Sequence, residues 1–98
     1  MTYVVQTVAK KQPGAEWWAK ANPEAAARLN EFVKGLGLIQ RRVKKQLDEN
    51  TVATRAFFAD EAAYNQYLAA VANNADFQSR EAWGKNAGQT AETKTAVI

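Results

Sequence analysis

A three-residue link in the middle of the chain constrains the fold more than any other feature. Asp48, Glu49 and Asn50 separate two predicted strands, residues 38–47 and 51–58, and the second of these is strongly apolar. A link this short joins only neighbouring antiparallel strands, because a parallel crossover needs roughly a dozen residues or more. The sequence therefore predicts a β-hairpin at its centre.

Further strand and helix signals flank this hairpin. The expected elements are a strand over residues 2–8, a helical lead-in over 15–21, a helix that starts at Asn22-Pro23 and ends at Gly35 or Gly37, a helix capped by Asp60, a shorter helix over about 76–86 and a last strand over 92–98. Two right-handed crossovers through helices then give a four-stranded antiparallel sheet in the strand order 4-1-3-2. The chain is predicted to be one α+β domain, residues 1–98, with the ferredoxin-like βαββαβ plan and its helices on one face.

The other face of that sheet is left without helices. A face in contact with water should carry polar residues at every second position. Val4-Val5 and Phe57-Phe58 instead place apolar side chains on both faces of two strands. We therefore expect a second copy of the chain to cover the helix-free face, in a homodimer that packs sheet against sheet.

The composition excludes several kinds of site. The 98 residues include neither cysteine nor histidine, so disulfides, thiolate or imidazole metal sites and histidine-dependent catalysis are ruled out within one chain. We accordingly expect no metal and no cofactor. No segment has the ~20 apolar residues of a membrane span, and the N-terminus lacks a signal-peptide pattern, so no membrane contact and a cytoplasmic location are expected.

Four basic residues lie within positions 41–45, and the formal net charge is +3. Alternate side chains of a strand point to opposite faces, so these cations are divided between two faces. The second strand is also expected at the sheet edge, where lysine and arginine prevent edge-to-edge association. The third strand lacks the glycines and alternating aromatics of RNA-recognition domains, which share this element order. No nucleic-acid partner is expected.

Four segments carry a likeness to a known superfamily. They are Tyr3–Gln6 in the first strand, Gly37–Ile39 at the entry to the second, Thr54–Ala62 from the third strand into a helix, and Ala75–Trp83 in the short helix. Together they resemble the dimeric α/β-barrel superfamily, and in particular its antibiotic-biosynthesis-monooxygenase-like members. The chain is also similar to uncharacterised dimeric ferredoxin-like proteins known from environmental sequencing.

The resemblance implies a dimer in which two sheets pack face to face, with a ligand pocket between each sheet and its own helices. Members of the superfamily include cofactor-independent oxygenases of aromatic polyketides, haem-degrading enzymes, isomerases and proteins of no known activity. The haem degraders use a histidine ligand, which this chain lacks. The resemblance therefore implies a fold and a place for a ligand, and it disfavours haem.

The candidate ligand contacts are Trp17, Tyr64 and Trp83 as an aromatic lining, with Arg55 and Gln6 as polar groups. Trp18 is assigned to the core because it shares a helical stripe with apolar residues of the following helix, whereas Trp17 points about 100° away. Arg55 lies in an otherwise apolar strand and needs either a carboxylate across a dimer or an anionic ligand. The alternative for the aromatic residues is packing in the core or the dimer.

Three functions are consistent with these observations, and whether the protein is an enzyme is left open. The first is a non-catalytic homodimer that binds a small apolar or aromatic molecule between sheet and helices. The second is a cofactor-independent monooxygenase or isomerase, in which a polar group such as Gln6, Asn65 or Arg55 stabilises an enolate. The third is a structural or partner-binding dimer with a filled interior. A cavity between the helices and the sheet separates the first two from the third.

Overall fold

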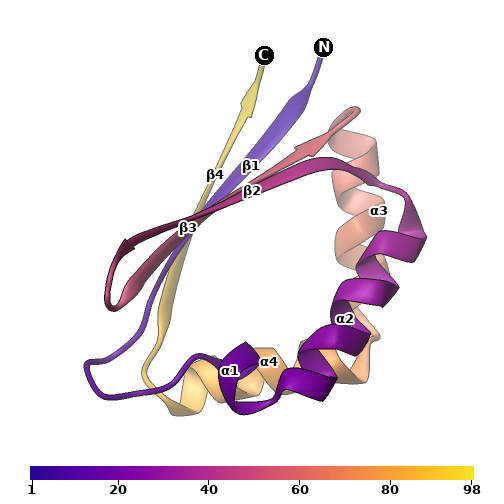
Figure 1. Ribbon diagram of the computed structural model, residues 1–98. Coiled ribbons are helices and arrows are strands. Elements are labelled where there is room, and N and C mark those ends of the chain that lie inside the picture. The colour runs from indigo at the N-terminus through magenta and orange to yellow at the C-terminus, as the bar shows by residue number, and fades with distance from the viewer.

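The computed structural model, residues 1–98, has one four-stranded antiparallel sheet with the helices on one side of it (Figure 1). In chain order, the elements are β1 (Tyr3–Lys10), α1 (Trp18–Ala21), α2 (Pro23–Leu36), β2 (Ile39–Asp48), β3 (Thr51–Phe58), α3 (Glu61–Ala72), α4 (Ala75–Asn86) and β4 (Thr90–Val97). The strands lie in the order β2-β3-β1-β4. This is the predicted order, so the ferredoxin-like α+β fold is confirmed.

β1 lies in the middle of the sheet and pairs with β3 and β4 along its whole length. Its register with β3 runs from Tyr3 opposite Phe58 to Lys10 opposite Thr51. On the other side, Lys10 lies opposite Thr90 of β4. β1 and β4 both extend two residues further at this end than the sequence predicts, because pairing satisfies backbone groups that turn residues would leave to water. The two chain ends lie side by side at the other end of the sheet (Figure 1).

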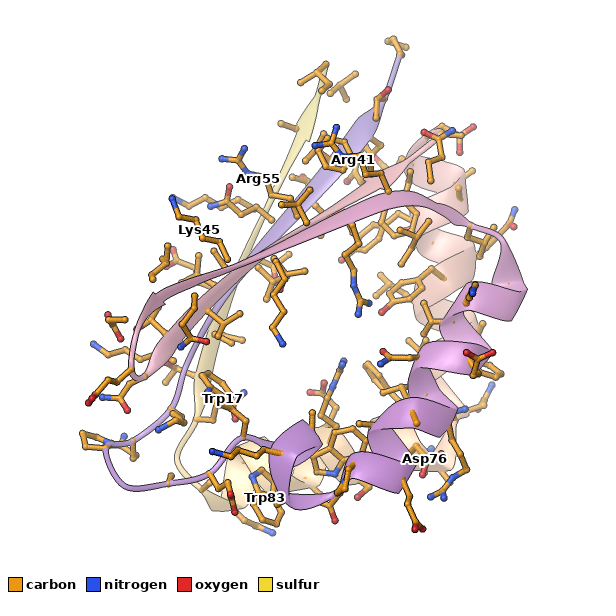
Figure 2. The ribbon with its side chains drawn as sticks, viewed as in Figure 1. Trp17, Arg41, Lys45, Arg55, Asp76 and Trp83 are labelled. Carbon is orange, nitrogen blue, oxygen red and sulfur yellow. The ribbon has the colours of Figure 1, made fainter.

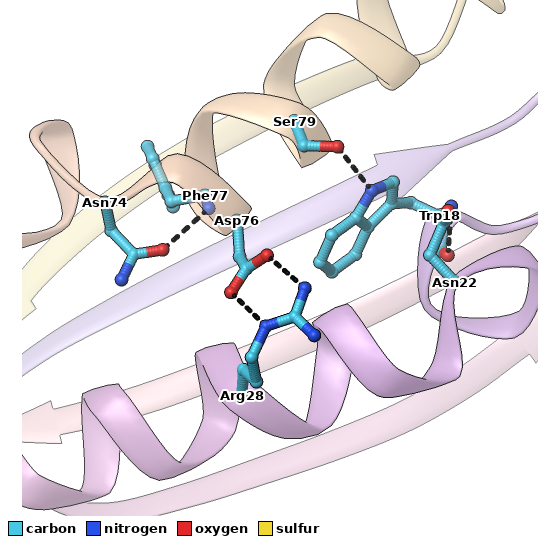
Figure 3. Close-up of polar contacts among 7 residues, drawn as sticks. All are labelled: Trp18, Asn22, Arg28, Asn74, Asp76, Phe77 and Ser79. Atoms are coloured by element: carbon cyan, nitrogen blue, oxygen red, sulfur yellow. Dashed lines mark hydrogen bonds and ion pairs between the residues drawn. The ribbon is translucent and has the colours of Figure 1, made fainter.

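Side chains cap two of the helices. The Asp60 carboxylate accepts a hydrogen bond of 2.8 Å from the backbone nitrogen of Ala63 at the start of α3, as predicted. The Asn74 side chain accepts one of 3.0 Å from the nitrogen of Phe77 at the start of α4 (Figure 3). Asn73 and Asn74 lie between α3 and α4, and Asn74 caps the start of α4.

Polar contacts hold α1 and α2 against α4 (Figure 3). The Trp18 indole nitrogen donates to the Ser79 hydroxyl at 3.2 Å. The Arg28 guanidinium donates to both carboxylate oxygens of Asp76, at 3.1 and 2.9 Å. Asn22 stands at the start of α2 as predicted, but its side chain donates to the Trp18 carbonyl at 3.1 Å and caps nothing. Its ψ of 65° departs from the extended conformation of a capping residue.

The apolar core is divided into two clusters. The first lies within the helix layer and consists of Trp18, Leu29, Val33 and Val71. The second lies between the sheet and α3 and consists of Tyr3, Val5 and Phe58. Ile39 and Tyr67 are partly buried and pack against both clusters. These two residues therefore join the helix layer to the sheet.

The face of the sheet opposite the helices has nothing packed on it, and we call it the open face. Tyr3 and Val5 pack on the helix side, so the alternate residues Val4 and Val8 point to the open face, together with Phe57 opposite Val4. The chain exposes 6546 Å², whereas a compact monomer of its mass exposes about 5,500 Å². The apolar residues that the sequence places on both faces of β1 and β3 are therefore observed there.

β2 is an edge strand and is exposed along nearly all of its length. Its register with β3 places Arg41 and Lys45 on the open face, and Arg42 and Lys44 on the helix side. Figure 2 shows Arg41 and Lys45 on the side of the sheet away from the helices. The basic run is divided between two faces, as predicted.

The ion pair of Arg28 and Asp76 makes stability depend on pH. Hydrogen bonds from Arg28 hold the pKa of Asp76 below its ordinary value. A carboxyl with a lowered folded pKa contributes stability above its unfolded pKa of about 3.9 and loses it as pH falls through the folded value. We therefore expect Asp76→Asn to destabilise the protein at about pH 6 and to have little effect near pH 2, measured by urea denaturation.

Glu81→Gln is the control for this pH dependence. Glu81 lies on the same helix, and its carboxylate is 3.9 Å from the Arg80 guanidinium, too far for a hydrogen bond. Its replacement should change stability little at either pH. An equal destabilisation by Asp76→Asn at both pH values would show that the ion pair contributes nothing.

Candidate functional site

A cleft of about 690 Å³ lies beside Trp17, where the loop between β1 and α1 faces the turn of the β2–β3 hairpin. Its lining consists of Lys11, Pro13, Gly14, Ala15, Glu16, Trp17, Lys20, Gln46, Glu49 and Asn50. This volume is in the range of small-molecule sites, roughly 300–1,000 Å³. The lining is mainly polar, unlike the apolar or aromatic pocket that the sequence suggested, because two surface turns supply most of it.

Lys11 joins the two sides of the cleft through hydrogen bonds to Asn50. Its backbone nitrogen donates to the Asn50 carbonyl at 2.8 Å, and its ammonium donates to Asn50 Oδ1 at 2.9 Å. The Asp48 carboxylate accepts a 2.8 Å bond from the backbone nitrogen of Asn50, and this bond lowers the pKa of Asp48. The hairpin turn is therefore held by an ionised carboxylate at neutral pH.

Trp17 forms the aromatic side of the cleft. Its side chain is half-buried, whereas Trp18 is only 4% exposed and belongs to the core, as the sequence predicts. The Lys11 ammonium lies 5.9 Å from the centre of the Trp17 ring, within the range of a cation–π interaction. The cleft thus combines an aromatic surface with a positive charge that hydrogen bonds hold in place.

Trp83 supports this arrangement from outside the cleft. Its indole nitrogen donates to the Glu16 carbonyl at 3.0 Å, and its ring packs against the core cluster of the helix layer. Glu16 directly precedes Trp17, so this bond holds the backbone that carries the Trp17 ring. Trp83 is absent from the cleft lining. In the structure it therefore holds the backbone next to Trp17 and lies outside the lining of this cleft.

Tyr64 lies at the opposite end of the sheet. Its ring centre is 5.7 Å from that of Tyr3 and 5.2 Å from that of Phe58. These two residues pair at the end of β1 that is farthest from the cleft, seven residues or roughly 23 Å from Lys10. Burial raises the pKa of Tyr64, so its hydroxyl is neutral at physiological pH. Tyr64 therefore cannot share one small site with Trp17.

Gln6 and Arg55 lie on the open face. They are directly opposite each other in the β1–β3 ladder, and Arg55 Nε donates to Gln6 Oε1 at 3.0 Å. Arg55 points away from the helices and forms no ion pair within the protomer (Figure 2). The five candidate residues are thus distributed over three places: the cleft region, the Tyr64 end of the core and the open face.

Lys11, Lys20, Gln46 and Asn50 line the cleft but were missed by the sequence analysis. There, residues 48–50 serve only as the link between two strands. One signal could have brought them together: if the first and third strands pair antiparallel, the end of the first meets the start of the third. The loop after the first strand and the hairpin turn must then lie at the same end of the sheet.

Solved structures with this fold include a dimeric ferredoxin-like protein from an uncultured marine organism. It is 12% identical to this chain, with a TM-score of 0.74 over 99% of this chain and 94% of the other. SnoaB, a cofactor-independent oxygenase from Streptomyces nogalater, is 15% identical, with a TM-score of 0.64 over 100% and 94%. A putative antibiotic biosynthesis monooxygenase from Chloroflexus aurantiacus is 16% identical, with a TM-score of 0.62 over 100% and 93%.

These neighbours are of the class that the sequence resemblance indicated, and at such identities they establish the ferredoxin-like fold alone. No protein-family model and no curated protein matches the sequence. No group of three or more acidic side chains is placed to hold a metal ion. None of the helices combines the length and the apolar character needed to cross a bilayer.

The two adjacent tryptophans should respond differently to truncation. We expect Trp18→Ala to lower the free energy of unfolding by about 3 to 5 kcal/mol, because it leaves a cavity in the helix-layer core. Trp17→Ala should cost about 1 to 2 kcal/mol, because its side chain is already partly in contact with water. Chemical denaturation of both variants measures the difference. Equal losses would show that Trp17 is also a packing residue.

Proposed function

We propose that the protein is a homodimer that binds a small molecule with an aromatic part and an anionic part in the cleft beside Trp17. The observation that supports the ligand is the pairing of the Trp17 ring with the Lys11 ammonium, 5.9 Å apart at a cleft of about 690 Å³. A planar group can stack on the indole while an acidic group meets Lys11 or Lys20.

The balance of charge in the cleft narrows the ligand class. Lys11 and Lys20 line it together with Glu16 and Glu49, so the lining has as many carboxylates as ammonium groups. A polyanion such as a nucleoside triphosphate would meet repulsion there as well as attraction. A ligand with one acidic group fits better.

The open face supports the homodimer. The chain exposes 6546 Å², about 1,000 Å² more than a compact monomer of its mass, and a standard interface buries about 800 Å² per partner. Val4, Val8 and Phe57 supply apolar contacts on that face. The marine ferredoxin-like protein with this fold is dimeric.

A cofactor-independent oxygenase or isomerase is the second candidate, supported by the likeness in fold to SnoaB. The positions of the polar groups expected to stabilise an enolate support this catalytic function less well than they support simple ligand binding. Gln6 and Arg55 are on the open face, and Asn65 is an exposed residue of α3, the helix that carries Tyr64. No expected enolate-stabilising group therefore lines the Trp17 cleft within one protomer.

A cytoplasmic location stays a prediction.

Ligand binding in the cleft can be tested with 1-anilinonaphthalene-8-sulfonate, which has an aromatic part and one anionic group. We expect saturable binding to the wild-type protein, measured by fluorescence titration. Trp17→Ala should raise the Kd about tenfold, because it removes the stacking surface. Trp83→Phe keeps most of the packing but loses the bond to Glu16, so it should weaken binding by a smaller factor.

Lys20→Gln tests the contribution of a cleft lysine, and Lys34→Gln is its matched control. Lys20 lines the cleft, whereas Lys34 is an exposed lysine in the last turn of α2. Only the first replacement should weaken binding of the probe. If Trp17→Ala binds the probe as the wild type does, the cleft is not the binding site.

The homodimer is tested by sedimentation equilibrium at micromolar concentration. We expect about twice the chain mass of 10.8 kDa. Phe57→Ser should raise the dimer Kd at least about 100-fold, because burial of each phenyl ring contributes about 1.5 to 3 kcal/mol and the dimer contains two, together about 3 to 6 kcal/mol. Leu68→Ser removes an apolar residue of α3 that is 41% exposed, and it should leave the Kd unchanged. A mass of 10.8 kDa at all concentrations excludes the dimer.

A further inference from the structure

We infer that the ligand of the Trp17 cleft is an aromatic zwitterion of the amino-acid class, whose carboxylate meets Lys20 and whose ammonium group meets Glu49. This inference rests on the proposed function. It adds a positively charged group to the ligand and assigns a partner to each of the ligand's two charges. The charged side chains that the cleft leaves unpaired are the observation that carries it.

Opposite charges line this cleft without contacting each other. The lining contains two ammonium groups and two carboxylates, which belong to Lys11, Lys20, Glu16 and Glu49. The two ion pairs of the chain lie on the helices, and neither includes a residue of the cleft. Positive and negative groups therefore remain separate around a space of about 690 Å³. A bound molecule with both signs of charge can contact both kinds of group at once.

The hydrogen bonds of the cleft show which of these charges are free. The Lys11 ammonium donates to Asn50 Oδ1 at 2.9 Å and lies 5.9 Å from the centre of the Trp17 ring, so it is already engaged. The side chains of Lys20 and Glu49 take part in no hydrogen bond or ion pair. Lys20 belongs to α1 and Glu49 to the hairpin turn. A free cation and a free carboxylate thus come from opposite sides of the cleft.

Lys20 is well placed to meet a molecule that stacks on Trp17. It follows Trp17 by three residues, and its backbone nitrogen donates to the Trp17 carbonyl at 3.1 Å. Residues three apart in a helical turn are neighbours, and both side chains line the cleft. A ligand stacked on Trp17 therefore has Lys20 on the side of α1 and Glu49 on the side of the hairpin. Glu16 is less suitable, because it directly precedes Trp17 on extended backbone, where adjacent side chains point in opposite directions.

A ligand with a single charge matches the lining less well. A simple anion is attracted by the two lysines but repelled by the two carboxylates, and for a simple cation the attraction and the repulsion are exchanged. A zwitterion can place each of its charges beside an opposite one. Because exposed ion pairs contribute little, each contact should change the affinity by only about two- to fivefold.

Three ligands that share a phenyl ring and differ in their charged groups test this inference. L-Phenylalanine carries both charges, 3-phenylpropionate lacks the ammonium group and phenethylamine lacks the carboxylate. Each is titrated into the wild-type protein at about pH 7 by calorimetry, and displacement of 1-anilinonaphthalene-8-sulfonate reports whether it binds in the cleft. We expect the Kd of L-phenylalanine to be about fivefold lower than the Kd of either other ligand.

Glu49→Gln tests the contact with the ammonium group. It should raise the Kd of L-phenylalanine about threefold and should not raise the Kd of 3-phenylpropionate, because for that ligand it removes a repulsive carboxylate. A purely structural role of Glu49 would weaken both ligands alike. Glu31→Gln is the matched control, because Glu31 is an exposed residue of α2 outside the cleft, and it should change neither Kd.

The outcomes separate this inference from the proposed function on which it rests. If 1-anilinonaphthalene-8-sulfonate binds in the cleft but L-phenylalanine binds no tighter than 3-phenylpropionate, the ligand site stands and the zwitterion is excluded. Equal weakening of both ligands by Glu49→Gln overturns the ammonium contact in the same way. If neither the fluorescent probe nor any of the three ligands binds in the cleft, the proposed ligand site itself is wrong.

Discussion

The pairing of β1 with strands on both sides is the interaction on which the rest of this structure depends. Its ladders to β3 and β4 are in register over all eight residues. They bring the chain ends together at one end of the sheet and set Lys10 beside Thr51 at the other. The cleft exists because of this second juxtaposition, since Lys11 and Asn50 directly follow and precede those two paired residues.

Side chains of β1 alternate between the two faces of the sheet, so the strand contributes to the core on one face and to the proposed interface on the other. Tyr3 and Val5 pack on the helix side and build the core, whereas Val4, Gln6 and Val8 point to the open face. A slip of one residue in the register would exchange the two sets, so the pairing of β1 determines both the core and the proposed interface. The helix side holds the candidate ligand site, and the open face holds the candidate contact between copies. The fold is shared with proteins that have different functions, so a function must be argued from these side chains.

Local chemistry made much of the fold predictable. The short link at residues 48–50 required a hairpin, and Asp60 capped the start of α3. Helical periodicity assigned Trp18, but not Trp17, to the core. The hairpin and the cap depend on residues within a few positions of one another, and the Trp18 assignment depends on helical periodicity along adjoining segments. The strand ends at Lys10 and Thr90 were missed, because they depend on partners far away in the sequence.

The sequence by itself determined the strand order, the division of the basic residues between two faces and the apolar character of both sides of the sheet. Only the tertiary structure decided which candidate residues share a site. Trp17 lies with Lys11 at the hairpin end, Tyr64 packs with Tyr3 at the other end, and Arg55 pairs with Gln6 on the open face. The physical reason is that residue types and their periodicity specify the face on which a side chain lies. Which end of the sheet it reaches depends on how distant segments pair, and that pairing is a property of the folded chain as a whole.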